Sequence, residues 1–563
     1  MNKRDFGSTH QSACLSPTRR NLLGLGAAGG MVALLGDIPL INQARAAGTP
    51  PTSPKGQVVI GLSQEPTVFN PLKPGVEVDQ GVWWSLFDPL WAVDPQGNLL
   101  PRLAMEIPTV ENGGISADGL SWKIKLRPGV KWHDGAPFTA EDVKFTLDLI
   151  NRPGFAAGNR QGHSLVRDIT VTGPLEISWK MESVYAPYLS LLAWTFIVPQ
   201  HILSKAEDPN TAPFNNQPVG TGAFRWGERA SGDRLTLVAN TNYFGDGPYL
   251  ERVIYKYIAD MNALYTQFRT GQIDHVSVDG LLPNFYADAK KLQGLTVVVT
   301  PSVAIESIAP NLGHPVLGDK AVRKALYGSF NKKAIIDIIN YGLPTATESF
   351  MPREAWFYNA NLPAQKVDVK GSNAILDQAG WVRGSDGMRK KGNQPLEFAI
   401  STTTGNSVRE QTQQLLQQDW KAIGVNLKIN NMPAAVMWGE FWVKSKFESA
   451  LVGSTFMTGN DPDCAYRFSS KATPATGGSG SNVYQYNNPE VDRLLAEGRT
   501  VIDRAARKAI YQQIQALVHD DLAVMPIYQY APVFGYKNGL MGYAPNTNVR
   551  IHTWNVAQWY WAA

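Results

Sequence analysis

Cysteine is nearly absent from this chain of 563 residues, which contains only Cys14 and Cys464. Cys14 lies upstream of Arg19 and Arg20, ahead of the first apolar run, so it cannot act as a lipid-anchor cysteine. If the first 46 residues are removed, Cys464 stands alone and no intramolecular disulfide can form. A single thiol also excludes an iron–sulfur cluster held by thiolates and a cysteine-rich zinc site.

The sequence also lacks the short motifs of common enzymes. No H-E-x-x-H, G-x-S-x-G, phosphate-binding loop or dinucleotide fingerprint occurs. We therefore expect no cofactor and no metal, although a hydrolase assembled from distant carboxylates or a triad would leave no local signature. No two histidines after residue 46 are spaced i, i+4, and each is expected to be a lone surface or core residue: His133, His163, His201, His275, His314, His519 and His552.

Long apolar runs and an excess of charge are missing as well. After residue 46 no stretch approaches the length of a membrane helix, so we expect the mature protein to be soluble. The net charge is +4, of which +3 falls within residues 1–46, and the balance in the rest argues against nucleic-acid binding. The length predicts two or three domains, and 44% hydrophobic with 18% charged residues is an ordinary globular composition.

Residues 1–46 have the pattern of an export signal. A twin-arginine element at 16–23 precedes a weakly apolar run at 22–35, and Ala44-Arg45-Ala46 offers a small-x-small cleavage site. The alternative is an uncleaved membrane anchor, but the Gly-rich run is short for a bilayer span and the charged Asp37 comes soon after it. We expect export to the periplasm by the twin-arginine pathway, with cleavage at or near Ala46.

The clearest local pattern lies between residues 99 and 150. Residues 121–127 alternate between apolar and basic side chains, which predicts a half-buried strand. Turns are expected at Pro128-Gly129 and Asp134-Gly135. Thr139 and Asp142 then form a capping-box pattern that starts a helix, with Val143, Leu147 and Ile150 on one face.

The same reasoning places further elements along the chain. Strand–helix–strand over 396–429 predicts a right-handed crossover between parallel strands. Other strands are expected at 57–62, 175–179, 234–238, 276–278, 295–300 and 523–530, and helices at 81–91, 186–194, 263–270, after Asp319, from Asn331 to Gly342, after Asn488-Pro489, and along 506–517. We expect Trp83, Trp84 and Trp91 to be core residues.

Several of these strings closely resemble the signature of extracellular solute-binding protein family 5, the peptide- and nickel-type receptors of bacterial ABC importers. The matching strings are L-P-R-L-A at 100–104, S-A-D-G at 116–119, L-R-P-G-V-K-W-H-D-G at 126–135 and T-A-E-D-V-K-F at 139–145, with others at 218–224, 319–326 and 375–381. The resemblance extends over nearly all of residues 57–563.

The resemblance implies an α/β, two-lobed periplasmic-binding-protein fold of class II, of the large peptide-binding type with an extra subdomain. Lobe I would comprise 47–305 plus 525–563, with the subdomain at about 82–214, and lobe II would comprise 306–524. Two crossing hinge strands would border a ligand cleft between the lobes. The implied function is capture of short peptides, without chemistry, by a monomer that delivers them to an inner-membrane ABC permease. The alternatives are a receptor for an opine-like conjugate or an oligosaccharide, and a periplasmic hydrolase.

One departure from the family pattern concerns the ligand. The family places an acid for the peptide amino group four residues before a proline, where this sequence has Thr458 ahead of Pro462, and a preceding tryptophan is replaced by Thr455. A hydroxyl cannot supply a charge-assisted bond to an ammonium group. Either Asp461 takes that role, or the ligand is not a free-amine peptide, or Asp461 merely starts a turn.

The resemblance extends to other positions, and for each of them plain packing is an open alternative. The complete set of expected ligand-binding residues is Phe69, Asn70, Thr221, Asn311, Trp438, Thr455, Phe456, Thr458, Asp461, Tyr528 and Tyr530.

Overall fold

The computed structural model describes residues 49–562 apart from 434–435, 458–459, 479 and 550–551, and these residues belong to one compact unit. The predicted leader and the expected binding residue Thr458 lie outside the described residues. Within this part of the chain, no helix is both long and apolar enough to cross a membrane.

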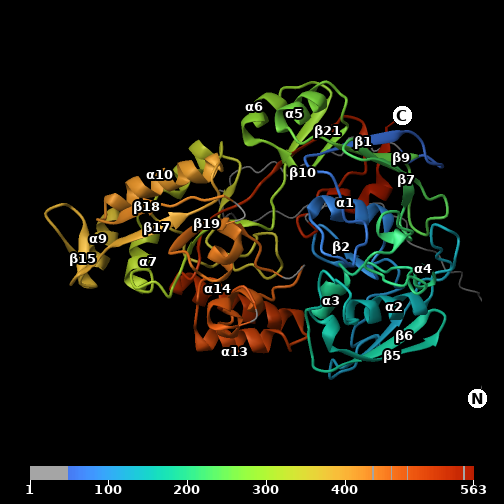
Figure 1. Cartoon of the computed structure of the whole chain (residues 1–563), viewed down its shortest axis with the longest axis horizontal. Coiled ribbons are helices and arrows are strands. Elements are labelled where there is room, and N and C mark those ends of the chain that lie inside the picture. Colours follow the sequence, from blue (N-terminus) through green and yellow to red (C-terminus); the bar gives the residue numbers. More distant parts are fainter. Residues whose placement is uncertain (1–48, 434–435, 458–459, 479, 550–551, 563) are drawn as a thin grey trace, which may run out of the picture. The chain divides into compact units, whose positions relative to one another are not determined.

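A seven-stranded mixed sheet forms the centre of the first lobe (Figure 1). β1 is parallel to both of its neighbours, β9 and β10, whereas β21 runs antiparallel to β10 and β11. The strands in spatial order are β11 (Leu295–Val299), β21 (Val533–Lys537), β10 (His275–Leu281), β1 (Gln57–Leu62), β9 (Arg252–Tyr257), β8 (Arg234–Ala239) and β7 (Phe224–Ala230). Helices α1 (Glu77–Leu86), α5 (Met261–Arg269) and α6 (Tyr286–Ala289) accompany this sheet.

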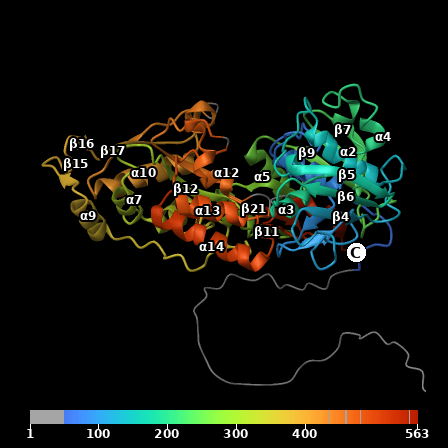
Figure 2. The same cartoon turned by 90° about the horizontal axis from the view of Figure 1, so that it is seen from below.

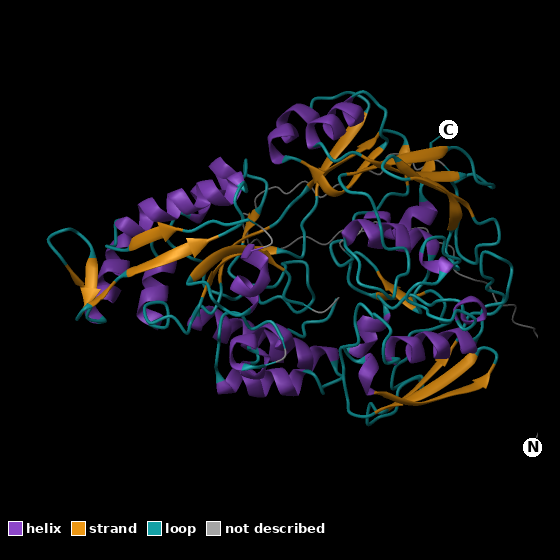
Figure 3. Ribbon diagram, viewed as in Figure 1, coloured by secondary structure: helices purple, strands orange, loops and turns teal. Residues whose placement is uncertain are grey.

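A smaller three-stranded antiparallel sheet lies in the same lobe, with α2 packed against two of its strands (Figure 3). Its order is β4 (Ser121–Lys125), β6 (Glu176–Met181) and β5 (Val166–Gly173), and near it in sequence are β2 (Trp91–Val93), β3 (Leu99–Pro101), α2 (Ala140–Asn151), α3 (Tyr188–Leu192) and α4 (Gln200–Leu203). The predicted alternation is confirmed, because Trp122 and Ile124 are buried while the lysines beside them are exposed. The predicted cap is confirmed too, since Asp142 accepts a hydrogen bond from the Thr139 N–H at 2.9 Å.

A six-stranded sheet forms the centre of the second lobe. Its order is β13 (Thr345–Ala346), β20 (Met525–Gln529), β12 (Ile305–Pro310), β19 (Ser449–Ser454), β17 (Glu397–Ser401) and β18 (Asn426–Ile429). β17 and β18 pair in parallel, and α10 (Ser407–Lys421) between them runs along β18 (Figure 1). The predicted strand–helix–strand unit with parallel strands is therefore confirmed.

Helices and a small sheet complete the second lobe, and α13 and α14 pack side by side (Figure 2). The helices are α7 (Lys320–Tyr327), α8 (Lys332–Ala334), α9 (Val369–Gln378), α12 (Ala465–Phe468), α13 (Pro489–Gly498) and α14 (Arg504–Asp521), and the small sheet contains β14 (Val382–Arg383), β15 (Arg389–Lys391) and β16 (Gln394–Pro395). The predicted N-caps are confirmed: the side chains of Asp319, Asn331 and Asn488 each accept a backbone N–H from the first turn of their helix.

Three helix boundaries differ from the prediction. The helix expected from residue 81 into a turn at Asp88-Pro89 begins earlier, at Glu77, and ends at Leu86 ahead of that turn, because Pro89 disfavours helical backbone just before it. Trp91 instead belongs to β2, although all three tryptophans of this segment are buried as predicted. The helix expected at 186–194 spans only Tyr188–Leu192, and the one expected to reach Gly342 passes into a π-helical turn and ends at Ile339.

The chain passes between the two large sheets twice. Residues 300–304 lead from β11 to β12, and residues 530–532 lead back from β20 to β21. The two crossing segments are hydrogen-bonded to each other: the Ser302 N–H donates to the Tyr530 carbonyl at 2.8 Å and the Tyr530 N–H donates to the Ala304 carbonyl at 3.0 Å. The two sheets are therefore joined by a short antiparallel ribbon.

Candidate ligand-binding site

A cavity of about 470 Å³ lies beside the crossing segments and is lined by residues of both lobes. From the first lobe come Glu77, Leu281, Leu282, Pro283, Val533, Phe534, Asn546, Thr547 and His552. From the second come Asn340, Leu343, Pro344, Asn406, Val408, Arg409, Gly453, Tyr528 and Tyr530. Apolar walls with a few placed polar groups are typical of small-molecule sites, and the volume lies within their usual range.

Arg409, which lines the cavity, belongs to a buried ion pair. Glu306 on β12 is 2% exposed, and it accepts hydrogen bonds from Nε and Nη2 of Arg409 at 2.8 and 2.9 Å. The Tyr530 hydroxyl donates to the same carboxylate, and Nη2 of Arg409 lies 3.3 Å from the Tyr530 hydroxyl oxygen. Burial alone would lower the pKa of Arg409, but the Glu306 carboxylate outweighs it and raises that pKa above its ordinary value.

His552 contributes an uncharged ring to the cavity lining. Burial lowers the pKa of His552 to about 3, so the imidazole is neutral at physiological pH. Its Nδ1 lies 2.6 Å from the Tyr543 hydroxyl oxygen, and its ring centroid is 3.6 Å from that of Phe534. The His552 ring therefore offers polar contact without charge, and Glu77 on α1 lines the same cavity.

Two of the predicted binding residues, Tyr528 and Tyr530, line this cavity. Arg409, Asn406 and His552 line it too, although none of the three was expected from the sequence. Arg409 is the third residue of a capped helix, and its partner Glu306 lies 103 residues away in the chain. No local pattern connects two residues at that separation, so the pair leaves no signal in the sequence.

Three other predicted residues lie in the first lobe and do not line the cavity. The Phe69 ring is buried and meets Trp226 edge-on at 4.8 Å. Asn70 donates from Nδ2 to Asn215 at 2.8 Å, and the Thr221 hydroxyl donates to Asp88 at 3.1 Å. These contacts are structural, and a role in binding for the three residues stays a prediction.

The predicted residues of the second lobe that fall outside the cavity lining also have structural partners. Asn311 donates from Nδ2 to the carbonyls of Ser445 and Phe447. Phe456 is buried in a stack with Phe468, and Trp438 meets Trp442 edge-on at 5.5 Å. Thr455 is partly buried. Ligand contact by these residues stays a prediction as well.

Asp461, the proposed substitute for the missing amine-binding acid, is already engaged. It is 2% exposed, and both its carboxylate oxygens accept from the Arg507 guanidinium, at 2.6 and 2.7 Å. A fork-to-fork pair of this kind satisfies both partners. An ammonium group that bound Asp461 would have to displace Arg507.

Asp461 borders a second, smaller cavity of about 130 Å³ that also has residues of both lobes in its walls. Direct contacts join the lobes there. The Tyr185 hydroxyl donates to Asp463 at 3.1 Å, and Asp463 also accepts from Nε of Arg499 at 3.0 Å. Nearby, Asn460 donates from Nδ2 to the Gly97 carbonyl at 3.1 Å.

The described residues include one thiol, and their possible metal ligands are dispersed. Within the part of the chain that the structure describes, no three His, Cys, Asp or Glu side chains are grouped so that they could hold a metal ion. Cys464 is fully buried, and burial raises the pKa of its thiol well above the ordinary value. A buried thiol of this kind is a poor nucleophile.

Known proteins match this chain over most of its length, both in sequence and in structure. The sequence is 26% identical over 532 residues to the oligopeptide-binding protein AppA of Bacillus subtilis (strain 168), covering 92% of this chain and 93% of that protein. A structure of the oligopeptide-binding protein AppA from Bacillus subtilis in complex with a nonapeptide matches with a TM-score of 0.73 and 25% identity, covering 92% of this chain and 100% of the other.

A second solved structure, NikZ from Campylobacter jejuni in complex with Ni(L-His), matches with a TM-score of 0.75 and 25% identity over 90% of this chain and 99% of that one. These matches confirm the predicted two-lobed α/β binding-protein fold. Residues 98–475 match the family described as bacterial extracellular solute-binding proteins, family 5 Middle. The chain belongs to this family of solute-binding proteins.

Proposed function

We propose that this protein captures short peptides outside the cytoplasm and delivers them to an ABC importer. The observation that carries the proposal is the cavity of about 470 Å³ lined by both lobes beside the two crossing segments. A small molecule held there contacts both lobes at once, so it stabilises the arrangement in which they close on it. Binding alone accounts for this geometry, and no chemical step is proposed.

The ligand class is inferred from the walls and from the relatives. AppA, a relative along almost its whole length, is an oligopeptide-binding protein, and its solved structure holds a nonapeptide. The polar groups of Asn340, Asn406, Asn546 and Thr547 provide donors and acceptors that suit a peptide backbone. The moderate volume favours peptides shorter than a nonapeptide.

Export and lobe organisation belong to the same proposal. We infer that residues 1–46 direct export by the twin-arginine pathway and are removed in the periplasm. The mature chain then divides into lobe I, residues 47–305 and 531–563 with its inserted subdomain at about 82–214, and lobe II, residues 306–530; the boundary predicted at 525 moves because β20 pairs with β12 in the second sheet. The protein acts as a monomer that presents its loaded form to the membrane permease.

Native mass spectrometry of the protein purified from the periplasm tests this function. The native species is expected to carry one or more peptides, which are lost on denaturation and can be sequenced from the released fraction. Refolded, emptied protein is expected to gain several degrees in Tm with those peptides and none with nickel chloride. Release of a sugar or an opine-like conjugate would contradict the ligand class, and steady cleavage of added peptide would contradict a purely binding role.

A further inference from the structure

Residues 340–344 of the second lobe, here called the strap, lie against the first lobe beside the cavity. Leu343 and Pro344 line the cavity together with residues 281–283 of the first lobe. The Leu343 side chain packs against an apolar cluster of the first lobe that contains Leu281. The strap is therefore part of the cavity wall, and it touches both lobes.

Both ends of the strap are fixed to the second lobe. It follows the π-helical turn Ile335–Ile339, where the Asn340 N–H and Nδ2 both donate to the Ile335 carbonyl, at 3.2 and 2.9 Å. It leads into β13, which pairs with β20. The hydrogen bonds of the strap among the described residues stay within the second lobe, so its contact with the first lobe is apolar. Such a contact can open without leaving a buried hydrogen-bonding group unpaired.

The strap contains a strained backbone. Tyr341 has a φ of +55°, in the left-handed region that a bulky side chain rarely adopts, and Gly342 follows with a φ of +71°. Left-handed backbone at a residue other than glycine costs free energy and persists only where neighbouring contacts hold it. The Tyr341 side chain is 59% exposed, so packing of its ring does little to hold this conformation. The packing of Leu343, two residues later, is the contact in place to do so.

We infer that the strap gates the cavity: it is closed while Leu343 packs against the first lobe, and it opens for peptide entry and release when Leu343 leaves that cluster. The inference rests on the proposed peptide-binding function. The packing of Leu343 favours the closed strap, whereas the strained backbone of Tyr341 favours the open one. These contributions oppose each other, which keeps the open strap accessible to thermal motion. Opening of the strap is then a step separate from rotation of the lobes.

Association and dissociation rates of a peptide probe test the inference, because a gate changes both rates in the same direction. The probe is a mixture of tri- to pentapeptides of Ala, Leu, Ser and Tyr, labelled with heavy isotopes. Emptied protein is mixed with the labelled peptides to follow loading, and loaded protein is diluted into an excess of the unlabelled mixture to follow release. Native mass spectrometry of samples taken over time measures both rates.

Leu343→Ala weakens the packing that keeps the strap closed. We expect both rates to rise about threefold to tenfold, while the dissociation constant changes by less than about threefold. Leu292→Ala is the matched control, because Leu292 packs against the same first-lobe cluster but does not line the cavity. The control should load and release peptides as the wild type does.

Tyr341→Gly acts in the opposite direction, because glycine adopts left-handed backbone without strain and so favours the closed strap. Both rates are expected to fall about threefold to tenfold. Tyr341→Ala removes the same ring but keeps a Cβ atom, so it should behave as the wild type. Tyr341 is exposed and does not line the cavity, so these variants should fold and cannot act through a lost ligand contact.

Two results would overturn the gate alone. One is a Leu343→Ala protein in which only the dissociation rate changes, which would make Leu343 a simple ligand contact. The other is a Tyr341→Gly protein whose rates equal those of Tyr341→Ala. Failure of the wild-type protein to retain any peptide of the mixture would instead overturn the peptide-binding function, and the gate with it.

Discussion

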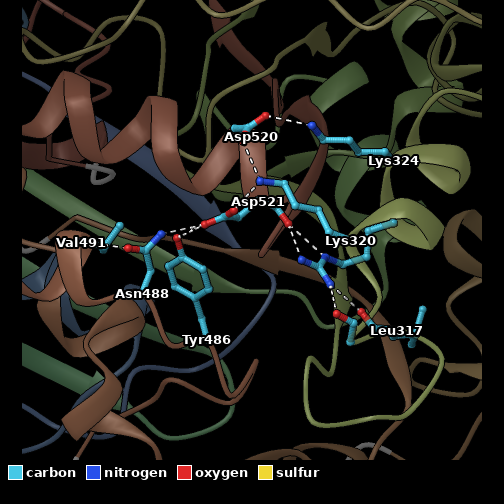
Figure 4. A network of polar contacts seen from close by, with 10 residues as sticks. Leu317, Lys320, Lys324, Tyr486, Asn488, Val491, Asp520 and Asp521 are labelled. Atoms are coloured by element: carbon cyan, nitrogen blue, oxygen red, sulfur yellow. Dashed lines mark hydrogen bonds and ion pairs between the residues drawn. The ribbon is translucent and has the colours of Figure 1, made fainter. Parts of the chain in front are cut away.

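Arg323 on α7 holds the C-terminal end of α14 through the main-chain carbonyl of Asp521. Its Nε and Nη2 donate to that oxygen at 2.9 and 2.8 Å, and its Nη1 donates to the carbonyls of Leu317 and Gly318. The Asp521 carboxylate in turn accepts from Lys320, Tyr486 and Asn488 (Figure 4). Arg323, the arginine of the D-x-x-V-R-x-A-L string, therefore has a structural role: it joins α7 to the C-terminal end of α14.

Replacement of Arg323 by lysine is expected to destabilise the protein by about 2–4 kcal/mol, because buried carbonyl groups lose their donors. Urea denaturation followed by circular dichroism measures the free energy of unfolding. Arg493→Lys, at an exposed arginine, should leave it unchanged within the error of the measurement. An Arg323→Lys protein as stable as the control would show that water replaces the guanidinium at no cost.

Asp461→Asn is expected to lower stability by about 3–5 kcal/mol, since it leaves the Arg507 guanidinium buried without its counter-charge. The double variant Asp461→Asn with Arg507→Gln should recover part of that loss, which a double-mutant cycle would reveal as a coupling free energy. If Asp461→Asn instead kept its stability and lost peptide binding selectively, Asp461 would be a ligand-binding acid after all.

Acid should weaken the fold through its buried histidines. Burial lowers the pKa of His133 and His163 to about 4 and that of His552 to about 3, against 6.5 in the unfolded chain. The unfolded state therefore binds more protons as the pH falls below 6.5, so stability declines toward the folded-state values. Each histidine contributes at most about 1.4 kcal/mol per pH unit in that window.

Urea midpoints at pH 7, 6 and 5 measure this loss. The decline between pH 6 and 5 should be shallower in His163→Gln, which removes one titrating group while retaining hydrogen-bonding capacity toward Tyr188 and Thr195. An unchanged slope in that variant would show that His163 does not contribute to acid sensitivity.

Tyr185→Phe should speed ligand release. It removes the hydroxyl that donates to Asp463 across the lobes, while Asp463 keeps its ion pair with Arg499. We expect the dissociation rate of bound peptide to rise about threefold to tenfold with little change in Tm, because the lobes lose one neutral-to-charged hydrogen bond between them. Stopped-flow displacement measures the rate, and an unchanged rate would mean that the contact does not restrain opening.

Features that depend on neighbouring residues were predictable from the sequence. The alternation at 121–125, the Thr139–Asp142 capping box and the parallel pair around α10 are each encoded within about thirty residues. The candidate site could be predicted from the sequence only in part. Tyr528 and Tyr530 were found because they lie at the crossing back to the first lobe, whose position the family resemblance indicates.

The rest of the site depends on partners that are far apart in the chain. The Arg409 side chain is held by its ion pair with Glu306, which is distant in the chain. The Asp461 carboxylate is likewise held by Arg507 on α14, 46 residues away. Local patterns could present Asp461 as either a ligand-binding acid or a turn residue, but they could not reveal that its charge is already neutralised inside the fold.

The hydrogen-bonded ribbon formed by residues 300–304 and 530–532 has a consequence for motion. Two strands tied along their length resist sliding past each other but still bend about the axis that crosses both. Because the two crossing segments are hydrogen-bonded to each other, the two lobes rotate relative to each other about this shared axis. A distortion of one segment is then transmitted to the other. A proline at Ser302 or at Tyr530, whose N–H groups donate within the ribbon, should therefore disturb opening and closing.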